Sequence, residues 1–311
     1  MKRLIIFLIF LSLNLKLNAY LRKKVIKDGK VQEIIEYGEI NWTDGILKVR
    51  GTSNLPIIIK NKFDPRTQSD DFEYAPDKAT ARLMALNKAK ELAIRNLTSA
   101  IYNLRIKDSY FVKDYLEKST NEFKTRLNEF ISTKSKSKVL YNRNETITVE
   151  LTVNLWGKNG FLSIIKNDDK NLIAFNTNNF KLSVTNTNIA STEEYIIPQE
   201  YTSLIIDATD IKGFQPALSP SIFDEAGNSV YNSTYVLKSY AQKNGIVKYV
   251  GEKSLVPKID FVKETAFFVR AISKGKTDTD LIIPNDVVKQ LFSSTKTFRY
   301  LKQCNVIIIT Q

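Results

Sequence analysis

The sequence predicts an α+β protein of two domains, each a mainly antiparallel sheet packed with helices, and three stretches carry this prediction. Over residues 77–104, apolar side chains recur every three or four positions, which is typical of one face of a long helix, and this helix is rich in alanine. Over residues 147–155, apolar and polar side chains alternate, as in a strand with one buried face. Residues 304–309 are dominated by β-branched side chains and fit a central strand.

The first domain is expected to span residues 20–156, with helices on one side of its sheet. Asp77 is the expected N-cap of the long helix, because its carboxylate can accept hydrogen bonds from the free amides of the first turn. The alanines of this helix are interpreted as a surface for close packing. The other expected segments are strands at 31–40 and 46–49, a polar loop at 61–76, a strand at 106–112, a second amphipathic helix at 114–131, and a hairpin of 139–141 with 147–155.

Residues 157–202 are expected to form a linker with one or two short strands, because they hold short apolar pieces and no long period. The second domain is expected to span residues 203–311. Its expected elements are strands at 203–208, 230–231, 265–273 and 304–309, a tight turn at 224–228, and short helices at 235–242 and 285–292.

The rare residue types exclude several kinds of site. The chain of 311 residues has 0 His and 1 Cys. Without His there is no Ser-His-Asp or Cys-His catalytic unit and no His-ligated metal, and one Cys makes no intrachain disulfide or Cys-rich zinc site. Cys304 is expected to be a small buried hydrophobe rather than a reactive thiol. We therefore expect no cofactor, no metal and no enzymatic activity.

The N-terminus predicts export. Residues 1–3 are a basic start, residues 4–13 are apolar apart from Ser12, and the next small residue suited to signal peptidase is Ala19. The apolar run is shorter than the roughly 20 residues of a membrane-spanning helix, so we expect a signal peptide cleaved after Ala19, with an uncleaved anchor as the alternative. No cysteine lies near this point, so we expect a periplasmic protein without a direct lipid anchor.

The chain is basic, with 46 Lys and Arg against 33 Asp and Glu and a formal net charge of +13. Such an excess bears on partners rather than on fold. Nucleic acid is disfavoured by the predicted signal peptide and by the lack of a groove-reading motif. Several basic residues on and after the second predicted helix form a candidate interaction surface. Its partner could be an acidic protein, the carboxylates of peptidoglycan or anionic lipid headgroups. The alternative is that these residues are only a solvated face. The residues of this surface are Lys124, Arg126, Lys134, Lys136 and Lys138.

Carboxylates are the remaining acid–base candidates, and those considered are Asp207, Asp210, Asp224, Glu225 and Asp260. A pair of them roughly 5–10 Å apart would suit glycoside hydrolysis. Asp224 is instead expected to stabilise the turn before Gly227 by accepting backbone amides. Asp278, Thr279 and Asp280 offer alternating oxygens for calcium, but the ligand loop with its bidentate Glu is missing.

Two long stretches resemble a known family. In the second half, the residues concerned are 203–208, 216–231, 240–241, 245 and 298–309, and in the first half they are 38–51 with Trp42, 81–85 and 89–97. They resemble bacterial exported proteins of the LPP20 lipoprotein family. The unit of strands followed by an Ala-rich helix is also similar to the N-terminal domain of the flagellar H-ring protein T and to the lipoprotein of flagellar basal disks.

The resemblance covers most of residues 33–155 and 203–310, and it implies an exported structural protein associated with a membrane or a flagellum. Membrane-bound members of the family carry an acylated Cys at the mature N-terminus. This sequence lacks that Cys, so the resemblance implies a soluble periplasmic form held by partners.

Together these observations predict a non-enzymatic periplasmic structural or assembly component of a cell-envelope complex, with the flagellar motor and motility as its setting. The expected partners are other envelope or motor proteins in a multi-subunit assembly. Two alternatives remain, namely an envelope protein that binds peptidoglycan or a membrane surface, and a carboxylate-based peptidoglycan hydrolase.

Overall fold

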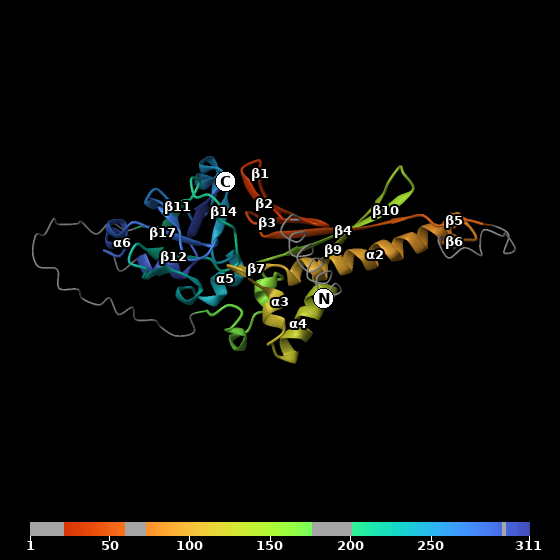
Figure 1. Cartoon of the computed structure of the whole chain (residues 1–311), viewed down its shortest axis with the longest axis horizontal. Coiled ribbons are helices and arrows are strands. Elements are labelled where there is room, and N and C mark those ends of the chain that lie inside the picture. Colours follow the sequence, from red (N-terminus) through yellow and green to blue (C-terminus); the bar gives the residue numbers. More distant parts are fainter. Residues whose placement is uncertain (1–21, 60–72, 176–200, 294–296) are drawn as a thin grey trace, which may run out of the picture.

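The computed structural model describes residues 22–59, 73–175, 201–293 and 297–311. The predicted signal peptide and most of the predicted loop at 61–76 lie outside these residues. The molecule is elongated, with the C-terminal domain at one end and a long helix running beside a sheet toward the other (Figure 1). This arrangement confirms the predicted α+β class with its long Ala-rich helix.

The N-terminal domain is built on a six-stranded antiparallel sheet, called sheet A here, in the order β1-β2-β3-β4-β10-β9. Its inner face is apolar along β4 and β10, where Leu47, Val49, Leu151 and Val153 are buried. Because side chains alternate along each strand, the intervening residues face outward. The strands are β1 (Lys23–Lys27), β2 (Lys30–Ile35), β3 (Gly38–Asn41), β4 (Ile46–Asn54), β9 (Lys136–Tyr141) and β10 (Thr146–Asn154).

The long helix α2 (Lys78–Tyr102) covers the inner face of sheet A. Its N-cap is Asp77, as predicted, and the Asp77 carboxylate accepts a hydrogen bond from the Thr80 amide at 2.9 Å. The contact with the sheet is close at Gly51, where an added Cβ would lie 2.2 Å from the backbone nitrogen of Ala93. The alanine stripe is therefore a packing surface, as the sequence indicates, and the buried alanines are Ala81, Ala85, Ala89, Ala93 and Ala100.

The segment after α2 differs from the prediction of one strand and one helix. A short hairpin is followed by two helices, because the chain turns after α3 and a new helix begins at the N-cap Thr120. The Thr120 hydroxyl accepts a hydrogen bond from the Phe123 amide at 3.3 Å. The elements are β7 (Arg105–Lys107), β8 (Tyr110–Phe111), α3 (Val112–Leu116) and α4 (Asn121–Thr133), and a second short pair is formed by β5 (Ile57–Ile58) and β6 (Tyr74–Ala75).

The prediction of a strand in the linker is wrong for residues 157–175. This segment forms the 3-10 turns η2 (Phe161–Ile164) and η3 (Asn167–Asp169). Phe161 and Leu162 are fully buried, and η2 contacts α4 and α5 (Lys238–Asn244). Its apolar side chains therefore join the core between helices rather than pairing with a sheet. Residues 176–200 lie outside the described residues.

The C-terminal domain differs from the expected antiparallel architecture, because its main sheet is parallel, in the order β14-β18-β11-β15. Every residue of β11 and β18 is buried, as in parallel sheets that are covered on both faces. Residues 304–309 do supply a central strand, as predicted. The strands are β14 (Lys248–Val250), β18 (Val306–Ile309), β11 (Ser203–Asp207) and β15 (Ala266–Arg270).

A smaller mixed sheet and short helices complete the C-terminal domain. The sheet runs in the order β13-β12-β17-β16, with β12 and β17 parallel. In the described part of the chain, no helix is both long and apolar enough to cross a membrane. The elements are β12 (Ser221–Asp224), β13 (Ser229–Tyr231), β16 (Ser273–Lys274), β17 (Asp280–Ile283), α6 (Asn285–Leu291), α7 (Thr297–Lys302), and the 3-10 turns η4 (Ser233–Tyr235) and η5 (Lys253–Lys258).

The two domains share one continuous hydrophobic core. Trp42, which follows β3, contacts Tyr249 of β14 edge-on with ring centroids 6.1 Å apart. The Tyr249 hydroxyl accepts a hydrogen bond from the Ala217 amide at 3.0 Å and donates one to the Ala217 carbonyl at 2.9 Å. These buried contacts hold the β1–β3 end of sheet A against the C-terminal domain.

Candidate functional site

The predicted basic surface is divided by the structure, and Arg126 does not belong to it. Nη2 of Arg126 lies 2.6 Å from Oδ2 of Asp169, and its Nε donates to the Ile164 carbonyl at 3.0 Å. Asp169 is 1% exposed and also accepts a hydrogen bond from the Tyr115 hydroxyl at 3.0 Å. Arg126 therefore stabilises the contact between α4 and the segment that follows sheet A.

The four lysines of the predicted surface lie on two different elements. Lys124 and Lys134 are exposed on α4 and at its C-cap. Lys136 and Lys138 are exposed on the edge strand β9, directly opposite Thr152 and Glu150 of β10. Those two lysines therefore face away from α2, on the outer face of sheet A.

The outer face of sheet A carries Lys and Arg side chains from four of its strands, β1, β2, β4 and β9, while β3 and β10 contribute Glu39 and Glu150. Its cross-strand neighbours include Lys48 beside Glu39, at 3.0 Å between Nζ and Oε1, and Arg50 beside Glu150, at 3.0 Å between Nε and Oε2. The two glutamates are thus already paired within the face. We call this surface the basic face and define it by Lys23, Lys27, Lys30, Lys48, Arg50, Lys136 and Lys138.

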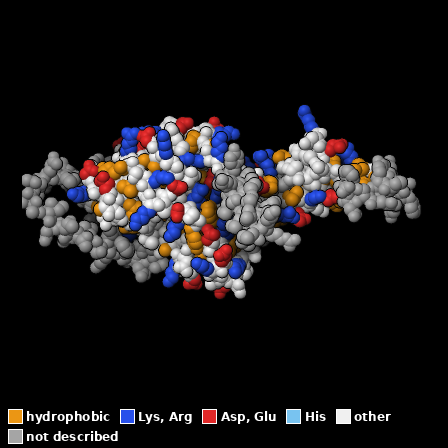
Figure 2. Space-filling view, viewed as in Figure 1, with side chains coloured by type: hydrophobic (Ala, Val, Ile, Leu, Met, Phe, Trp, Pro, Cys, Tyr) orange, Lys and Arg blue, Asp and Glu red, His pale blue; other side chains and the backbone are white. Residues whose placement is uncertain are grey.

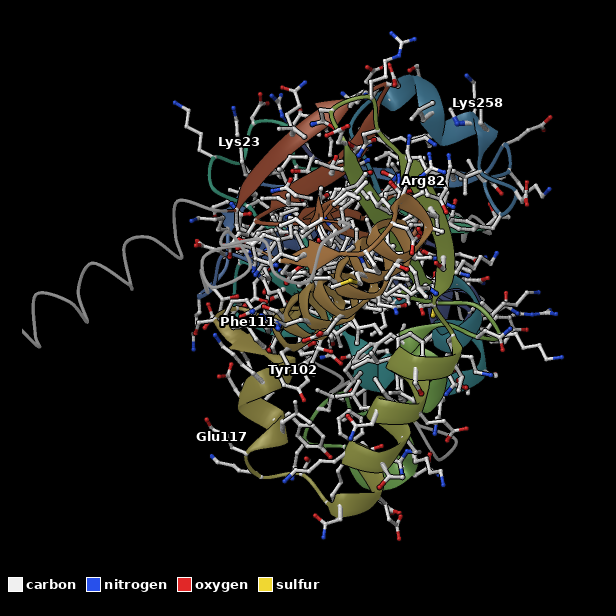
Figure 3. The ribbon with its side chains drawn as sticks, turned by 90° about the vertical axis from the view of Figure 1, so that its right-hand side faces the viewer. Lys23, Arg82, Tyr102, Phe111, Glu117 and Lys258 are labelled. Atoms are coloured by element: carbon white, nitrogen blue, oxygen red, sulfur yellow. The ribbon has the colours of Figure 1, made fainter. Side chains whose placement is uncertain are left out.

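Among the described elements, α2 covers the inner face of sheet A, opposite to the basic face. Figure 3 shows the sheet on one side of α2, with α3 and α4 on the other side and Lys23 at the edge of the sheet. Lys136 and Lys138 have no ion pair among the described residues, which leaves their charge available to a partner. Figure 2 shows Lys and Arg side chains spread over the visible side of both domains among acidic ones.

Four of the five candidate catalytic carboxylates, Asp207, Asp210, Asp224 and Glu225, have a structural partner. Asp207 lies 2.6 Å from Nζ of Lys253 and accepts hydrogen bonds from the amide and hydroxyl of Thr209. Burial alone would raise the pKa of Asp207, but the bonds from Lys253 and Thr209 outweigh it and lower the pKa below its ordinary value. Asp210 pairs with Arg270. An ionised and paired carboxylate is a poor general acid at neutral pH.

The acidic turn after β12 is also structural. Asp224 accepts the Asn228 amide at 2.7 Å and its side-chain amide at 2.8 Å, which confirms the predicted turn. Glu225 accepts the Asn285 amide at 2.9 Å and so ties the turn to the start of α6. Asp260 is exposed. The bonds of Asp224 and Glu225 therefore stabilise the turn and its contact with α6.

The candidate calcium residues do not converge on a cation. Asp278 pairs with Lys274, and the Thr279 hydroxyl accepts the Asp108 amide at 2.8 Å. Asp280 is 7% exposed, and burial raises its pKa above the ordinary value. In the described ranges, no group of three or more His, Cys, Asp or Glu side chains could hold a metal ion.

Cys304 lies at the turn before β18 and is buried, at 2% exposed, as predicted. Burial raises the pKa of its thiol to about 12, so the thiolate is not populated near neutral pH. Its backbone is in the left-handed region, with φ at +62°. The thiol is therefore a structural group and not a nucleophile.

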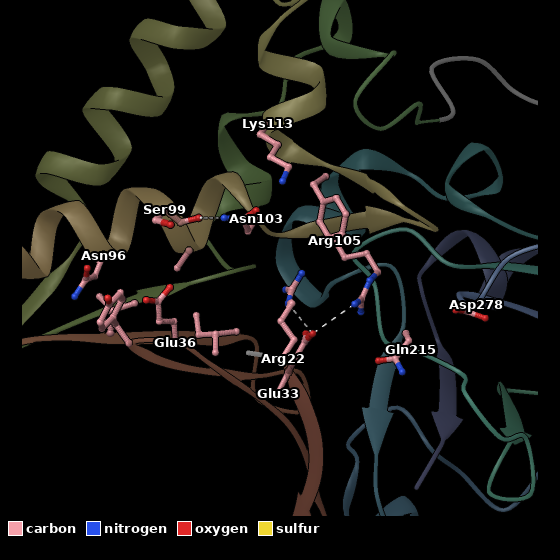
Figure 4. Close-up of a pocket in the computed structure, with 15 residues that line it drawn as sticks. Arg22, Glu33, Glu36, Asn96, Ser99, Asn103, Arg105, Lys113, Gln215 and Asp278 are labelled. Carbon is pink, nitrogen blue, oxygen red and sulfur yellow. Dashed lines mark hydrogen bonds and ion pairs between the residues drawn. The ribbon is translucent and has the colours of Figure 1, made fainter. Parts of the chain in front are cut away.

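A cavity of about 490 Å³ lies where the two domains meet, and the sequence did not predict it. Figure 4 shows Arg22 and Arg105 on either side of Glu33, with Lys113 above them. Oε1 of Glu33 lies 2.9 Å from Nε of Arg22 and 3.5 Å from Nη2 of Arg105. In the sequence, the signal that could have indicated this cavity is Glu33, because it is a charged residue at a position of β2 whose side chain faces inward.

The cavity is lined by both domains. From the N-terminal domain come the end of α2, with Asn96 and Asn103, and the ring of Phe111. From the C-terminal domain come Gln215 and Asp278. Pockets of this size between domains are common sites for small molecules.

The comparison with known families gives a match for the C-terminal domain. Residues 203–311 match the family model of the second domain of Treponema pallidum Tp0624. The matched range begins at β11 and includes the whole parallel sheet, so it corresponds to a complete structural unit. No curated protein matches the chain. The resemblance to LPP20 and flagellar proteins therefore stays a prediction.

Proposed function

We propose that this protein is a non-enzymatic structural or assembly component of a bacterial cell-envelope complex, which acts in the periplasm and binds an acidic partner protein through the basic face. The flagellar motor is the assembly that we propose. One observation carries the proposal, namely that Lys136 and Lys138 stand without ion pairs, among the described residues, on a sheet face that no described helix covers.

The geometry of the basic face supports binding by charge. Its internal glutamates are already neutralised by Lys48 and Arg50, so the charges of Lys136 and Lys138 are not balanced locally. Complementary charge on a partner accelerates association and fixes its register. The structural bonds made by the carboxylates support a binding role over catalysis, because they leave Asp207 and Asp224 without a free acid–base function.

Charge reversal tests the proposal. A Lys136→Glu/Lys138→Glu variant and a matched Lys90→Glu variant, whose changed residue is exposed on α2, would be crosslinked in envelope fractions of the native cell. We expect the double variant to lose a defined crosslinked acidic partner and Lys90→Glu to keep it. Equal crosslinking of all three chains would overturn the use of the basic face.

The flagellar setting is tested separately by deleting the gene and imaging motors in the cell. We expect a loss of motor density in the periplasm together with reduced motility. Normal motility with unchanged motor density would remove the motor from the proposal, while the charge-reversal result would still decide whether the basic face binds a protein.

A second candidate function is binding to peptidoglycan or to an anionic membrane surface, which the same basic face favours. Isolated sacculi and vesicles with anionic headgroups would then bind the wild-type chain in a salt-dependent way, because exposed charges are screened within about 10 Å at 0.1 M salt. Binding that does not depend on salt concentration would contradict this role.

The third candidate, a carboxylate-based hydrolase, requires that Asp207→Asn or Asp224→Asn abolishes an activity on sacculi.

A further inference from the structure

We propose that the cavity between the two domains binds a small organic anion through a carboxylate or phosphate group, with Arg22, Arg105 and Lys113 as its cationic contacts. This site is separate from the basic face and does not depend on the function proposed above. Three features support this site: the charges around Glu33, the hydrogen-bond donors that remain free in the cavity, and the ring of Phe111 beside the cations.

The first argument is an excess of positive charge. Glu33 is 1% exposed, and its carboxylate faces both Arg22 and Arg105. Lys24 lies on the same side of the sheet, opposite Glu33 in the β1–β2 pairing. Burial, followed by repulsion from Arg105, lowers the pKa of Lys24 to about 8. The ammonium of Lys24 donates to the Phe214 carbonyl at 2.8 Å and to the Thr310 hydroxyl at 3.1 Å, and it does not line the cavity. The cations of the lining are Arg22, Arg105 and Lys113, and a bound anion would balance the positive charge that Glu33 and Glu36 leave.

The second argument is that donors remain available. Nη1 of Arg22 is buried and has no hydrogen-bond partner among the described residues. A buried, unsatisfied charged donor is costly, and a ligand oxygen would remove this cost. Arg105 uses Nη1 for the Pro216 carbonyl at 2.9 Å, which fixes its guanidinium at the wall. The amine of Lys113 points into the cavity in Figure 4.

The third argument is an apolar contact for the body of the ligand. Arg22, Arg105 and Lys113 lie 5.5, 5.9 and 5.4 Å from the centroid of the Phe111 ring. The ring stabilises these cations and offers its remaining surface to an apolar group. Ile35 extends the apolar lining. A ligand with an anionic head and a short apolar body fits this pattern.

The acidic residues of the lining leave one positive charge unbalanced, because Glu33 and Glu36 stand against Arg22, Arg105 and Lys113. Asp278 is paired with Lys274. Glu36 accepts a hydrogen bond from the Tyr37 hydroxyl, which raises the pKa of Tyr37. Figure 4 places Glu36 and Asp278 on opposite sides of the Arg22–Glu33–Arg105 cluster. The anionic group is therefore expected beside Arg22 and Lys113.

The experiment uses sodium benzoate and sodium phosphate as probes and neutral benzamide as the control, all at constant ionic strength. Binding to the full chain would be measured by calorimetry and by the shift in Tm, because a ligand that binds only the folded state raises Tm. The variants are Lys113→Met and Arg22→Met. Lys118→Met, which removes a neighbouring exposed charge outside the cavity, is the matched control.

We expect benzoate or phosphate to bind, and each cavity variant to weaken this binding about tenfold, as the loss of one charge-assisted hydrogen bond predicts. Lys118→Met should bind like the wild type. Lys113→Met decides the result if Arg22→Met fails to fold, because Lys113 is exposed and has no ion pair among the described residues.

Three results would overturn the proposal. They are the absence of binding by both anions, equal binding of benzamide and benzoate with no effect of phosphate, and wild-type affinity in Lys113→Met. Binding of benzoate indicates a carboxylate site, and binding of phosphate indicates a phosphate site. None of these results affects the basic face, because Lys136 and Lys138 lie on the other side of sheet A.

Discussion

The indole N–H of Trp42 donates a hydrogen bond to Oε2 of Glu33 at 3.1 Å, and both side chains are buried. Oε1 of the same carboxylate faces Arg22 and Arg105. Trp42 also contacts Tyr249 of the other domain. Glu33 therefore connects the core at the domain boundary with the cations of the cavity.

Glu33→Gln is expected to lower the free energy of unfolding by about 3 kcal/mol, because it leaves buried guanidinium groups without a counter-charge. Urea unfolding followed by circular dichroism measures this loss. Glu39→Gln is the control, since Glu39 forms a partly exposed pair with Lys48 and should cost about 1 kcal/mol or less. Similar losses in the two variants would contradict the role assigned to Glu33.

Arg126→Met is expected to cost about 3 kcal/mol, because Asp169 would keep a buried charge without its cation. In a double-mutant cycle, Arg126→Met/Asp169→Asn should lose less than the sum of the two single variants. Lys124→Met, on the exposed side of α4, should stay close to the wild type. Additive losses would show that the two side chains do not stabilise each other.

Gly51→Ala is expected to destabilise the N-terminal domain by about 2 kcal/mol, because the new methyl group would overlap the backbone of α2 at Ala89 and Ala93. Thermal unfolding would show the loss as a lower Tm. The comparison is Leu83→Ala on the same helix, where the side chain is 57% exposed and little change is expected. An unchanged Tm in Gly51→Ala would mean that α2 can move away from sheet A at no cost.

The free energy of unfolding of the wild type is expected to fall relative to that of Cys304→Ala as the pH rises above 9. Burial raises the pKa of the thiol to about 12 in the folded chain, from an ordinary value of 9.0. Above pH 9 the unfolded chain therefore releases a proton that the folded chain retains, so stability falls with pH. The difference between the two chains should change by about 1.4 kcal/mol per pH unit. Parallel pH curves would contradict it.

Export is expected to produce a mature chain that begins at Tyr20. Mass spectrometry of protein isolated from the periplasm of a bacterial host measures the N-terminus directly. Ala19→Arg should block processing, because signal peptidase requires a small residue there. A full-length mass for the wild-type chain would instead favour the uncleaved anchor.

Local pattern was sufficient for much of the N-terminal domain. The period of residues 77–104 and the short polar side chain of Asp77 define α2 and its start, because helix periodicity and capping depend on neighbours in sequence. The alternation over residues 147–155 likewise gave β10. The parallel pairing of β11 with β15 and β18 was not predicted, although a continuous apolar run such as that of β18 is typical of a parallel strand buried on both faces.

The grouping of the predicted basic surface also could not be derived correctly from the sequence. Lys136 and Lys138 were grouped with Arg126 because they are close in sequence, yet Arg126 turns inward to Asp169 while the two lysines face outward from β9. Which side chain faces a buried carboxylate depends on how α4 and the segment after sheet A come together. That contact joins residues more than 40 positions apart, so sequence proximity could not reveal it.

The sequence by itself determined the α+β class, the close packing of the Ala-rich helix, the burial of Cys304 and the structural turn at Asp224, because each depends on composition or on short-range spacing. The tertiary structure alone decided which lysines share the basic face and which cations gather around Glu33. Arg22, Arg105 and Gln215 meet at one cavity only because the two domains bury a common core, and long-range packing of this kind leaves no periodic trace in the chain.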